Sequence, residues 1–241
     1  MKRYIVYVPH KCGSTIISRI LNDVFNPPKS IGGIKEATIN NDSGEAKLQF
    51  KRNIRFPDAE SPIDFNKDDF IYIPRNPIGI TTSMYYSFGY THKCPGYLTQ
   101  EKREKFELNR QKIQKTGLHN YIENNISIQS TKIENFWNLP VTSKTILPYE
   151  FMLDNFSKFL KELLQALDMT SVYDKTYEKW KGSFAQIEDK SDLIEAGKLK
   201  VHKRTTDIYE WKKKLDEDFL ASLLKECPFI SEYDKHLKVW L

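Results

Sequence analysis

Five consecutive residues near the start of the chain carry groups suited to holding an anion. They are Lys11-Cys12-Gly13-Ser14-Thr15, and they offer an ammonium group, two hydroxyls and one residue without a Cβ. A β-branched and aromatic run at residues 3–8 precedes them and predicts a buried strand. Behind them the apolar residues recur every three or four positions, which predicts an amphipathic helix. The expected structure is therefore a strand, a tight loop and a helix.

The chemistry of this loop follows from the helix that it begins. The first N–H groups of a helix have no partner inside it, and the helix dipole adds partial positive charge there. An anion at that point meets donors and a favourable field together. Gly13 allows the backbone to approach closely, Lys11 adds a full charge, and Ser14 or Thr15 is expected at the N-cap. The predicted ligand is a phosphate or sulfate group.

The spacing does not fit two other phosphate-binding loops. The Walker pattern has its lysine directly after the second glycine, whereas Lys11 precedes Gly13. A phosphatase-like Cys-x5-Arg loop that starts at Cys12 requires arginine at position 18, which is Ser18. Cys12 is therefore not expected to be a nucleophile.

The composition is typical of one substantial globular domain, predicted to span residues 1–241. Hydrophobic residues make up 39% of the 241 residues, charged residues 29%, and the net charge is +5. That mild excess suits a small anionic ligand as well as a polyanion. The three cysteines are an odd number and far apart, so neither a disulfide framework nor a zinc site is expected.

The sequence also gives expectations about membranes and compartment. The first predicted strand starts three residues into the sequence, which leaves no room for a signal peptide. No run approaches the roughly 18 apolar residues of a membrane span. The expected location is therefore the cytoplasm, with no membrane-spanning segment.

Strands alternate with helices along the chain, which predicts an α/β fold with a central parallel sheet flanked by helices. The further strands are expected at residues 48–50, 70–73 and 145–147. The further helices are expected at residues 78–88, 100–125, 156–167 (capped by Asp154) and 216–227. Ligands bind at the carboxyl ends of the strands of such sheets. The loop at Lys11 and Arg75 both follow strands, so they are expected to share one crevice.

Arg75 and Ser83 could form a second anion site. Arg75 leaves the predicted strand in Pro74-Arg75-Asn76-Pro77, and Ser83 follows eight residues later in the predicted helix. A guanidinium group offers a planar fork of donors that suits a phosphate. A structural ion pair of Arg75 with an incidental Ser83 is the alternative.

Together these segments resemble the sulfotransferases that use 3′-phosphoadenosine 5′-phosphosulfate (PAPS). That family has a loop P-K-x-G-[ST]-[ST], here with His10 inserted between Pro9 and Lys11, and a second motif R-[ND]-P with a serine eight residues after the arginine. A Tyr-Glu-Asp-Leu segment of the family resembles residues 149–152, and its R-K-G-x-x-G-D-W motif resembles residues 204–211, where the lysine and both glycines are replaced. The resemblance covers most of the chain and implies a P-loop-like, nucleotide-binding transferase.

The resemblance implies a role for each matching residue. Lys11, Ser14 and Thr15 would hold the 5′-phosphosulfate, together with the backbone at Cys12 and Gly13. Arg75 and Ser83 would bind the 3′-phosphate, with Arg204 as a third contact. Tyr149 would lie at the adenine, whereas Ile16 replaces the tryptophan with which many members contact that base. PAPS is then the donor, adenosine 3′,5′-bisphosphate is the product, and no metal is required.

The implied reaction is in-line sulfuryl transfer to a hydroxyl or amine, with Lys11 stabilising the leaving phosphate. A base must accept the acceptor's proton. Glu36, just before a possible strand, and His92, in an aromatic loop, are the candidate bases, and a solvated surface residue is the alternative for each. His10 could instead touch the phosphosulfate, and His119 is expected at a helix start.

The acceptor is expected among small molecules, carbohydrates and lipids, held by loops at residues 27–66 and 89–120. A P-loop kinase and a non-catalytic polyanion-binding module remain alternatives. Nucleic acid is not the expected partner. The sequence does not specify the oligomeric state.

Overall fold

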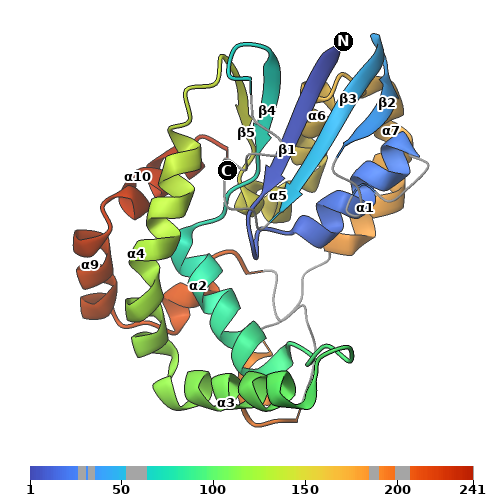
Figure 1. Ribbon diagram of the computed structural model, residues 1–241. Helices are drawn as coiled ribbons and strands as arrows, with labels where there is room; N and C mark the ends of the chain where they lie inside the picture. The colour runs from blue at the N-terminus through green and yellow to red at the C-terminus, as the bar shows by residue number, and fades with distance from the viewer. Residues whose placement is uncertain (27–30, 32–35, 53–63, 185–189, 199–206, 241) are drawn as a thin grey trace. The chain divides into compact units, whose positions relative to one another are not determined.

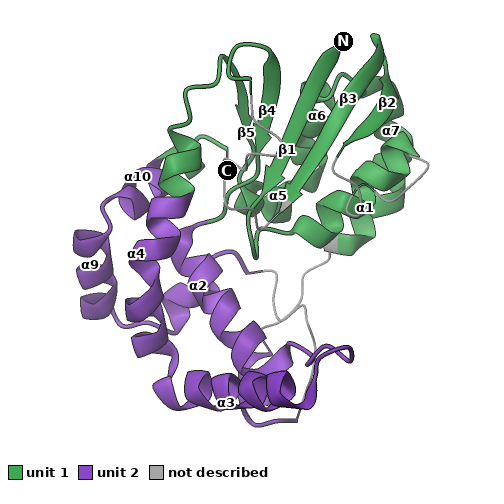
Figure 2. Ribbon diagram, viewed as in Figure 1, with its two compact units in different colours: residues 1–75, 133–185, 236–241 green, residues 76–132, 186–235 purple. Residues whose placement is uncertain are grey.

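The computed structural model describes residues 1–26, 31, 36–52, 64–184, 190–198 and 207–240. The chain divides into two compact units, green and purple in Figure 2. Unit 1 comprises residues 1–75, 133–185 and 236–241, and unit 2 comprises residues 76–132 and 186–235. Each unit is described by itself. One domain over residues 1–241 stays a prediction.

Unit 1 contains a five-stranded mixed sheet with the strand order β2-β3-β1-β4-β5 (Figure 1). Strand β1 pairs in parallel with β3 and β4, and β4 pairs in parallel with β5, whereas β2 runs antiparallel to β3. The predicted α/β class is confirmed, but the prediction of a wholly parallel sheet is wrong. The strands are β1 (Lys2–Val8), β2 (Ala37–Asn41), β3 (Gly44–Arg52), β4 (Asp68–Tyr72) and β5 (Ser143–Ile146).

The antiparallel edge has a local cause. Only Asp42 and Ser43 separate β2 from β3, and a two-residue connection can join only antiparallel neighbours. Gly44 supplies a φ of 120° at the turn, a conformation that side chains disfavour. Strand β2, which the sequence indicated only as a possible strand after Glu36, therefore belongs to a hairpin.

Helices cover the sheet of unit 1. Helix α1 (Ser14–Phe25) follows β1, and α5 (Tyr149–Asp154), α6 (Phe156–Ala166) and α7 (Tyr173–Trp180) follow β5. Helix α6 packs against β4 through a fully buried apolar face that includes Phe159 and Leu163. The N-cap of α6 is Asn155, whose side chain accepts a hydrogen bond from the N–H of Lys158, and not Asp154 as predicted. Asp154 instead ends α5.

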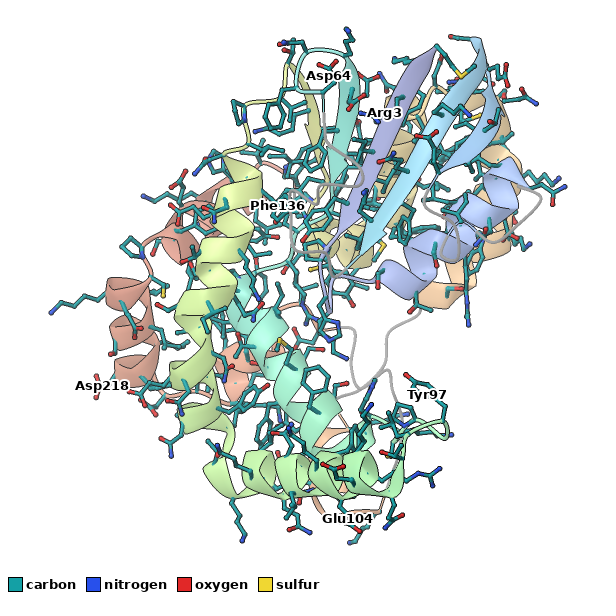
Figure 3. All side chains as sticks on the ribbon, viewed as in Figure 1. Arg3, Asp64, Tyr97, Glu104, Phe136 and Asp218 are labelled. Atoms are coloured by element: carbon teal, nitrogen blue, oxygen red, sulfur yellow. The ribbon has the colours of Figure 1, made fainter. Side chains whose placement is uncertain are left out.

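Aromatic side chains fill one face of the sheet. Tyr7 of β1 and Phe70 and Tyr72 of β4 are buried against Phe136, from the end of α4 (Leu118–Trp137). The rings of Tyr7 and Phe136 lie 4.1 Å apart between centroids, and Figure 3 labels Phe136. Phe70 and Tyr72, at alternate positions of β4, thus bury large rings on one face, as the period of a strand requires.

Ion pairs join β1 and β4 at their amino ends. The guanidinium of Arg3 donates from Nε to Oδ1 of Asp68 over 2.7 Å and from Nη2 to Oδ2. The backbone N–H of Asp64 donates to the same carboxylate over 2.7 Å. Figure 3 labels Arg3 and Asp64. Lys2 and Asp69 form a neighbouring ion pair at 2.7 Å.

Unit 2 is helical in its described part. Helix α2 (Pro77–Tyr86) continues into a π-helical turn at Ser87–Thr91. The segment expected to be helical at 100–125 forms α3 (Gln100–Thr116) and the start of α4, separated at Gly117, whose φ is 74°. The helix start expected at His119 is confirmed, because α4 begins at Leu118. The predicted helix at 216–227 is confirmed as α9 (Glu217–Glu226), which Asp216 caps. Helix α10 (Phe229–Leu237) was not expected, nor was α8 (Ser191–Glu195).

Two apolar clusters hold unit 2 together. One joins Ile78 of α2 to Ile122 and Ile126 of α4 and to Trp211 and Ile230. The other joins Tyr85 and Tyr86 to Ile113, Tyr121 and Ile194. No helix within the described residues is long and apolar enough to cross a membrane.

Candidate functional site

The loop between β1 and α1 reverses the chain through two left-handed residues. Lys11 has a φ of 64°, and Gly13 has a φ of 82° and a ψ of 20°. The N–H of Cys12 donates to the carbonyl of Pro9 over 3.2 Å and closes the turn. Gly13 is the N-cap of α1, without a side-chain cap, so the prediction of Ser14 or Thr15 at that position is wrong. Both hydroxyl residues instead lie in the first turn of the helix.

The start of α1 presents backbone donors to the loop. The N–H groups of Ile16 and Ile17 both donate to the carbonyl of Gly13, over 3.0 and 3.1 Å. Within the described part of the chain, the N–H groups of Ser14 and Thr15 have no backbone acceptor. Ser14 is half-buried and Thr15 is exposed. An anion could accept from these donors in the positive field of the helix end.

Gly13 cannot be replaced without displacing its neighbours. A Cβ at this position would lie 3.0 Å from Cε of Met152 and 3.0 Å from Cε2 of Tyr149. Its positive φ also disfavours any side chain. The first turn of α5 therefore packs directly on the glycine of the loop.

Cys12 faces the interior of unit 1. Its side chain is fully buried, and its thiol donates to the carbonyl of His10 over 3.6 Å. Burial is the main cause that raises the pKa of the Cys12 thiol well above its usual range, and the charge of Glu150 adds to it. A buried thiol with a raised pKa is a poor nucleophile, as the sequence spacing also indicated.

Lys11 and Arg75 bring two cations to the same loop. Arg75 follows β4, is 7% exposed, and donates from Nη1 to the carbonyl oxygen of Lys11 over 3.1 Å. Burial, and to a smaller extent the charge of Arg75, together lower the pKa of the Lys11 ammonium to about 8. Two adjacent positive charges raise the free energy of the loop, and a bound anion would relieve that cost.

Tyr149 lies directly against Arg75. The guanidinium carbon of Arg75 is 4.7 Å from the centroid of the Tyr149 ring. The backbone N–H of Tyr149 donates to the carbonyl of Pro74 over 2.7 Å, which fixes the start of α5 beside the end of β4. The next residue, Glu150, is 1% exposed and places a carboxylate in the same layer.

Glu36 lies away from the carboxyl ends of the parallel strands. It is exposed, and its carboxylate accepts from Nε2 of Gln49 over 2.9 Å and lies 3.8 Å from Nζ of Lys47. Gln49 pairs with Ile5, three residues before the end of β1. Three residues of a strand span about 10 Å. A catalytic role for Glu36 stays a prediction.

The sequence Asn76-Pro77 makes a well-formed helix start in unit 2. The side chain of Asn76 caps α2 by accepting from the N–H of Ile78 over 2.8 Å, and Pro77 occupies the first turn. Nδ2 of Asn76 donates to Oδ1 of Asp234 over 2.8 Å. Ser83 lies in the same helix and is half-buried. Its assignment to the 3′-phosphate stays a prediction.

His92 ends the π-helical turn of unit 2. Its N–H donates to the carbonyl of Ser87 over 2.6 Å, and its ring lies 5.7 Å from Phe88 and 6.2 Å from Phe106 between centroids. Its carbonyl accepts from Nη2 of Arg110 on α3. The described contacts of the side chain are thus aromatic, and its role as a base stays a prediction.

The structure therefore brings together only part of the predicted set. Lys11, Gly13, Arg75 and Tyr149 converge within unit 1, while Ser83 and His92 belong to unit 2 and Arg204 lies outside the described residues. Sequence reasoning missed Glu150 and Met152 as neighbours of the loop. Their place at the start of an apolar helix after a strand was the available signal.

The described residues contain no group of three or more His, Cys, Asp or Glu side chains that could hold a metal ion. In comparisons with known proteins, no family model matches the chain, and no curated protein matches it either.

Proposed function

We propose that this protein is a sulfotransferase, which moves the sulfuryl group of PAPS to a hydroxyl or amine of a small-molecule, carbohydrate or lipid acceptor. The observation that carries the proposal is the convergence of Lys11 and Arg75 on the N-terminal end of α1. The order of the motifs in the sequence supports the same donor. One site of unit 1 supports the proposal, and over the rest of the chain the sequence motifs support it.

The described residues fit the charge of the donor. The N–H groups of Ser14 and Thr15 and the ammonium of Lys11 would hold the 5′-phosphosulfate. The guanidinium of Arg75 carries five donors, and a phosphate could accept from those that do not face the loop carbonyl. Ser83 and Arg204 are further proposed contacts of the 3′-phosphate.

In the proposed reaction, the bond between the sulfur and the bridging oxygen of the 5′-phosphate breaks, and a bond forms between the sulfur and the acceptor atom. The acceptor's proton passes to a base, and negative charge develops on the leaving phosphate. A protonated Lys11 stabilises that charge. With a pKa of about 8, Lys11 is largely charged at pH 7, and a neighbouring anion raises its pKa.

Thermal unfolding with two nucleotides tests the donor. Adenosine 3′,5′-bisphosphate should raise the Tm of the protein more than ATP does, because ATP lacks a 3′-phosphate. Arg75→Ala should abolish that preference. Arg19→Ala is the matched control, because Arg19 is exposed on α1 and is assigned no role. Equal shifts with both nucleotides, or no shift with either, would contradict the proposal, and a preference for ATP would favour a kinase.

A second experiment identifies the acceptor and the base. Labelled PAPS and a panel of phenols, sugars and lipid headgroups should give one class of labelled product. Glu36→Gln and His92→Asn then separate the candidate bases, since only the true base should lower turnover with little change in donor affinity. Unchanged turnover in both variants would remove both candidates.

A further inference from the structure

The aromatic ring at the start of α5 contacts the loop and its second cation at once. The guanidinium carbon of Arg75 lies 4.7 Å from the centroid of the Tyr149 ring. At the edge of the same ring, Cε2 would be only 3.0 Å from a Cβ added to Gly13. A cation over an aromatic face is attracted by the electron density of the ring. Tyr149 therefore restrains both partners of the contact between Arg75 and the loop.

The backbone around this ring is fixed from two sides. The N–H of Tyr149 donates to the carbonyl of Pro74, the residue directly before Arg75. Nη1 of Arg75 in turn donates to the carbonyl of Lys11, whose φ of 64° is unusual for a residue with a side chain. The chain of contacts runs from Tyr149 to Arg75 and from Arg75 to the loop.

We propose that Tyr149 is a positioning residue, whose ring holds the Arg75 guanidinium against the loop and so controls anion binding through Arg75. This inference rests on the proposed anion site of the sulfotransferase. It gives Tyr149 a different role from the adenine contact that the family resemblance implies. The two roles differ in one respect that can be measured: a positioning residue affects any anion at the loop, whereas an adenine contact affects only ligands with the base.

Four proteins and two ligands separate these roles. The proteins are the wild type, Tyr149→Met, Arg75→Ala and the double variant, and the ligands are adenosine 3′,5′-bisphosphate and inorganic sulfate. Methionine keeps most of the volume beside Gly13 but removes the aromatic face. Tyr149→Met should lower the affinities for both ligands by the same factor, about tenfold. Tyr149→Phe keeps the ring and should bind both ligands within about twofold of the wild type.

The double variant tests whether Tyr149 acts through Arg75. Once Arg75 is alanine, the added Tyr149→Met change should have no further effect on sulfate affinity, because contacting residues are not additive. Additive effects would overturn the inference. A loss confined to the bisphosphate would also overturn it and would favour the adenine contact. Tyr149→Leu repeats the comparison if Tyr149→Met does not give a wild-type circular dichroism spectrum.

The pH dependence supplies a measurement that a purely structural role would not change. Sulfate keeps its charge between about pH 6 and 10, so a loss of its binding over that range reports titrating groups of the protein. Among the described residues, the titratable groups near Lys11 and its neighbour Cys12 are His10 on the loop, Tyr7 on β1, Tyr72 on β4, Arg75 after β4, and Tyr149 and Glu150 on α5. Because the charge of Arg75 lowers the pKa of Lys11, a looser Arg75 should move the midpoint of sulfate binding to higher pH in Tyr149→Met.

The outcomes distinguish this inference from the proposed function. If the wild type binds sulfate but not the bisphosphate, the sulfotransferase proposal fails. The sulfate affinities of the single and double variants then still test the role of Tyr149. If the wild type binds neither ligand, both proposals are overturned. If Tyr149→Met changes neither the affinity for sulfate nor the pH at which half of the sulfate binding is lost, the positioning role alone would be overturned.

Discussion

The basic residues at the two ends of β1 have pKa values that are shifted in opposite directions. At the amino end, Arg3 meets the carboxylate of Asp68, and that hydrogen bond raises the pKa of Arg3. Beyond the carboxyl end, burial and the neighbouring charge of Arg75 lower the pKa of Lys11. The pKa of the basic side chain is thus raised near one end of β1 and lowered beyond the other.

This difference separates a structural contact from a functional one. An arginine paired with a buried carboxylate stabilises the fold and needs no ligand. At Lys11, burial and the neighbouring charge of Arg75 disfavour the ammonium form, and perturbed titratable groups of this kind concentrate at functional sites. The carboxyl end of the sheet is therefore the end at which an anion is expected.

Lys11→Met should produce the largest change and should move binding and stability in opposite directions. Loss of the charge should lower the affinity for adenosine 3′,5′-bisphosphate about a hundredfold, measured by isothermal titration calorimetry. The free energy of unfolding at pH 7 should rise by about 1–3 kcal/mol, because the buried charge disappears. Lys2→Met makes the same substitution at the amino end and should leave the affinity unchanged. A destabilised Lys11→Met with wild-type affinity would contradict the comparison.

The stabilisation by Lys11→Met should depend on pH with a defined sign. The pKa of Lys11 falls from 10.5 to about 8 on folding, so below pH 8 both states are protonated and the full cost is present. Between pH 8 and 10.5 the unfolded chain binds more protons, and this cost of Lys11 fades as the pH rises. Urea unfolding of wild type and variant should therefore converge toward pH 10.5. A constant difference across that range would show that Lys11 has an ordinary pKa.

Arg3→Met should lower stability and leave binding alone. The substitution removes the guanidinium that donates to the buried carboxylate of Asp68, which is 3% exposed. It should decrease the free energy of unfolding by about 2 kcal/mol in urea titrations. The affinity for the bisphosphate should stay within about twofold. A large loss of affinity in this variant would mean that the two ends of β1 are not independent.

Gly13→Ala should give the smallest effect on stability of these variants, about 1–2 kcal/mol, measured by thermal unfolding. Its cause is the left-handed φ together with the crowding by Tyr149 and Met152. Gly197→Ala is the matched control, since Gly197 has a φ of 70° and no atom within 4 Å of an added Cβ. If only the backbone angle matters, the two variants should lose equal stability. A greater loss at Gly13 supports the close packing of α5 on the loop.

Local patterns predicted much of unit 1 and part of unit 2. The apolar run of β1, the spacing of α1 and the Asn76-Pro77 helix start depend on neighbouring residues, so they could be recognised in the sequence. The strand β2 was expected only as a possible strand after Glu36, and its antiparallel pairing was missed, because Ala37–Asn41 is short and follows a stretch of prolines and glycines. The N-cap was misassigned because hydroxyl residues are the common caps, whereas the N-cap residue here has a left-handed φ of 82°, which favours glycine.

Lys11 and Arg75 were expected to lie together because both follow strands, but the individual contacts of the candidate site join residues distant in the sequence and could not be predicted. The hydrogen bond from Arg75 to the Lys11 carbonyl joins positions 64 residues apart. The ring of Tyr149 reaches Arg75 only because β4 and α5 meet in the fold. The sequence suggested which residues could bind an anion, but not the contact between Arg75 and Tyr149 on which the proposed positioning role rests.

The most direct test of the account is the affinity of the wild-type protein for adenosine 3′,5′-bisphosphate at pH 7 and pH 9, measured by isothermal titration calorimetry with ATP as the comparison. With Lys11 at a pKa of about 8, the bisphosphate should bind more tightly than ATP at pH 7 and lose about tenfold in affinity at pH 9. Equal affinity for the two nucleotides, or bisphosphate affinity that does not change with pH, would contradict the assignment of this loop as the donor site.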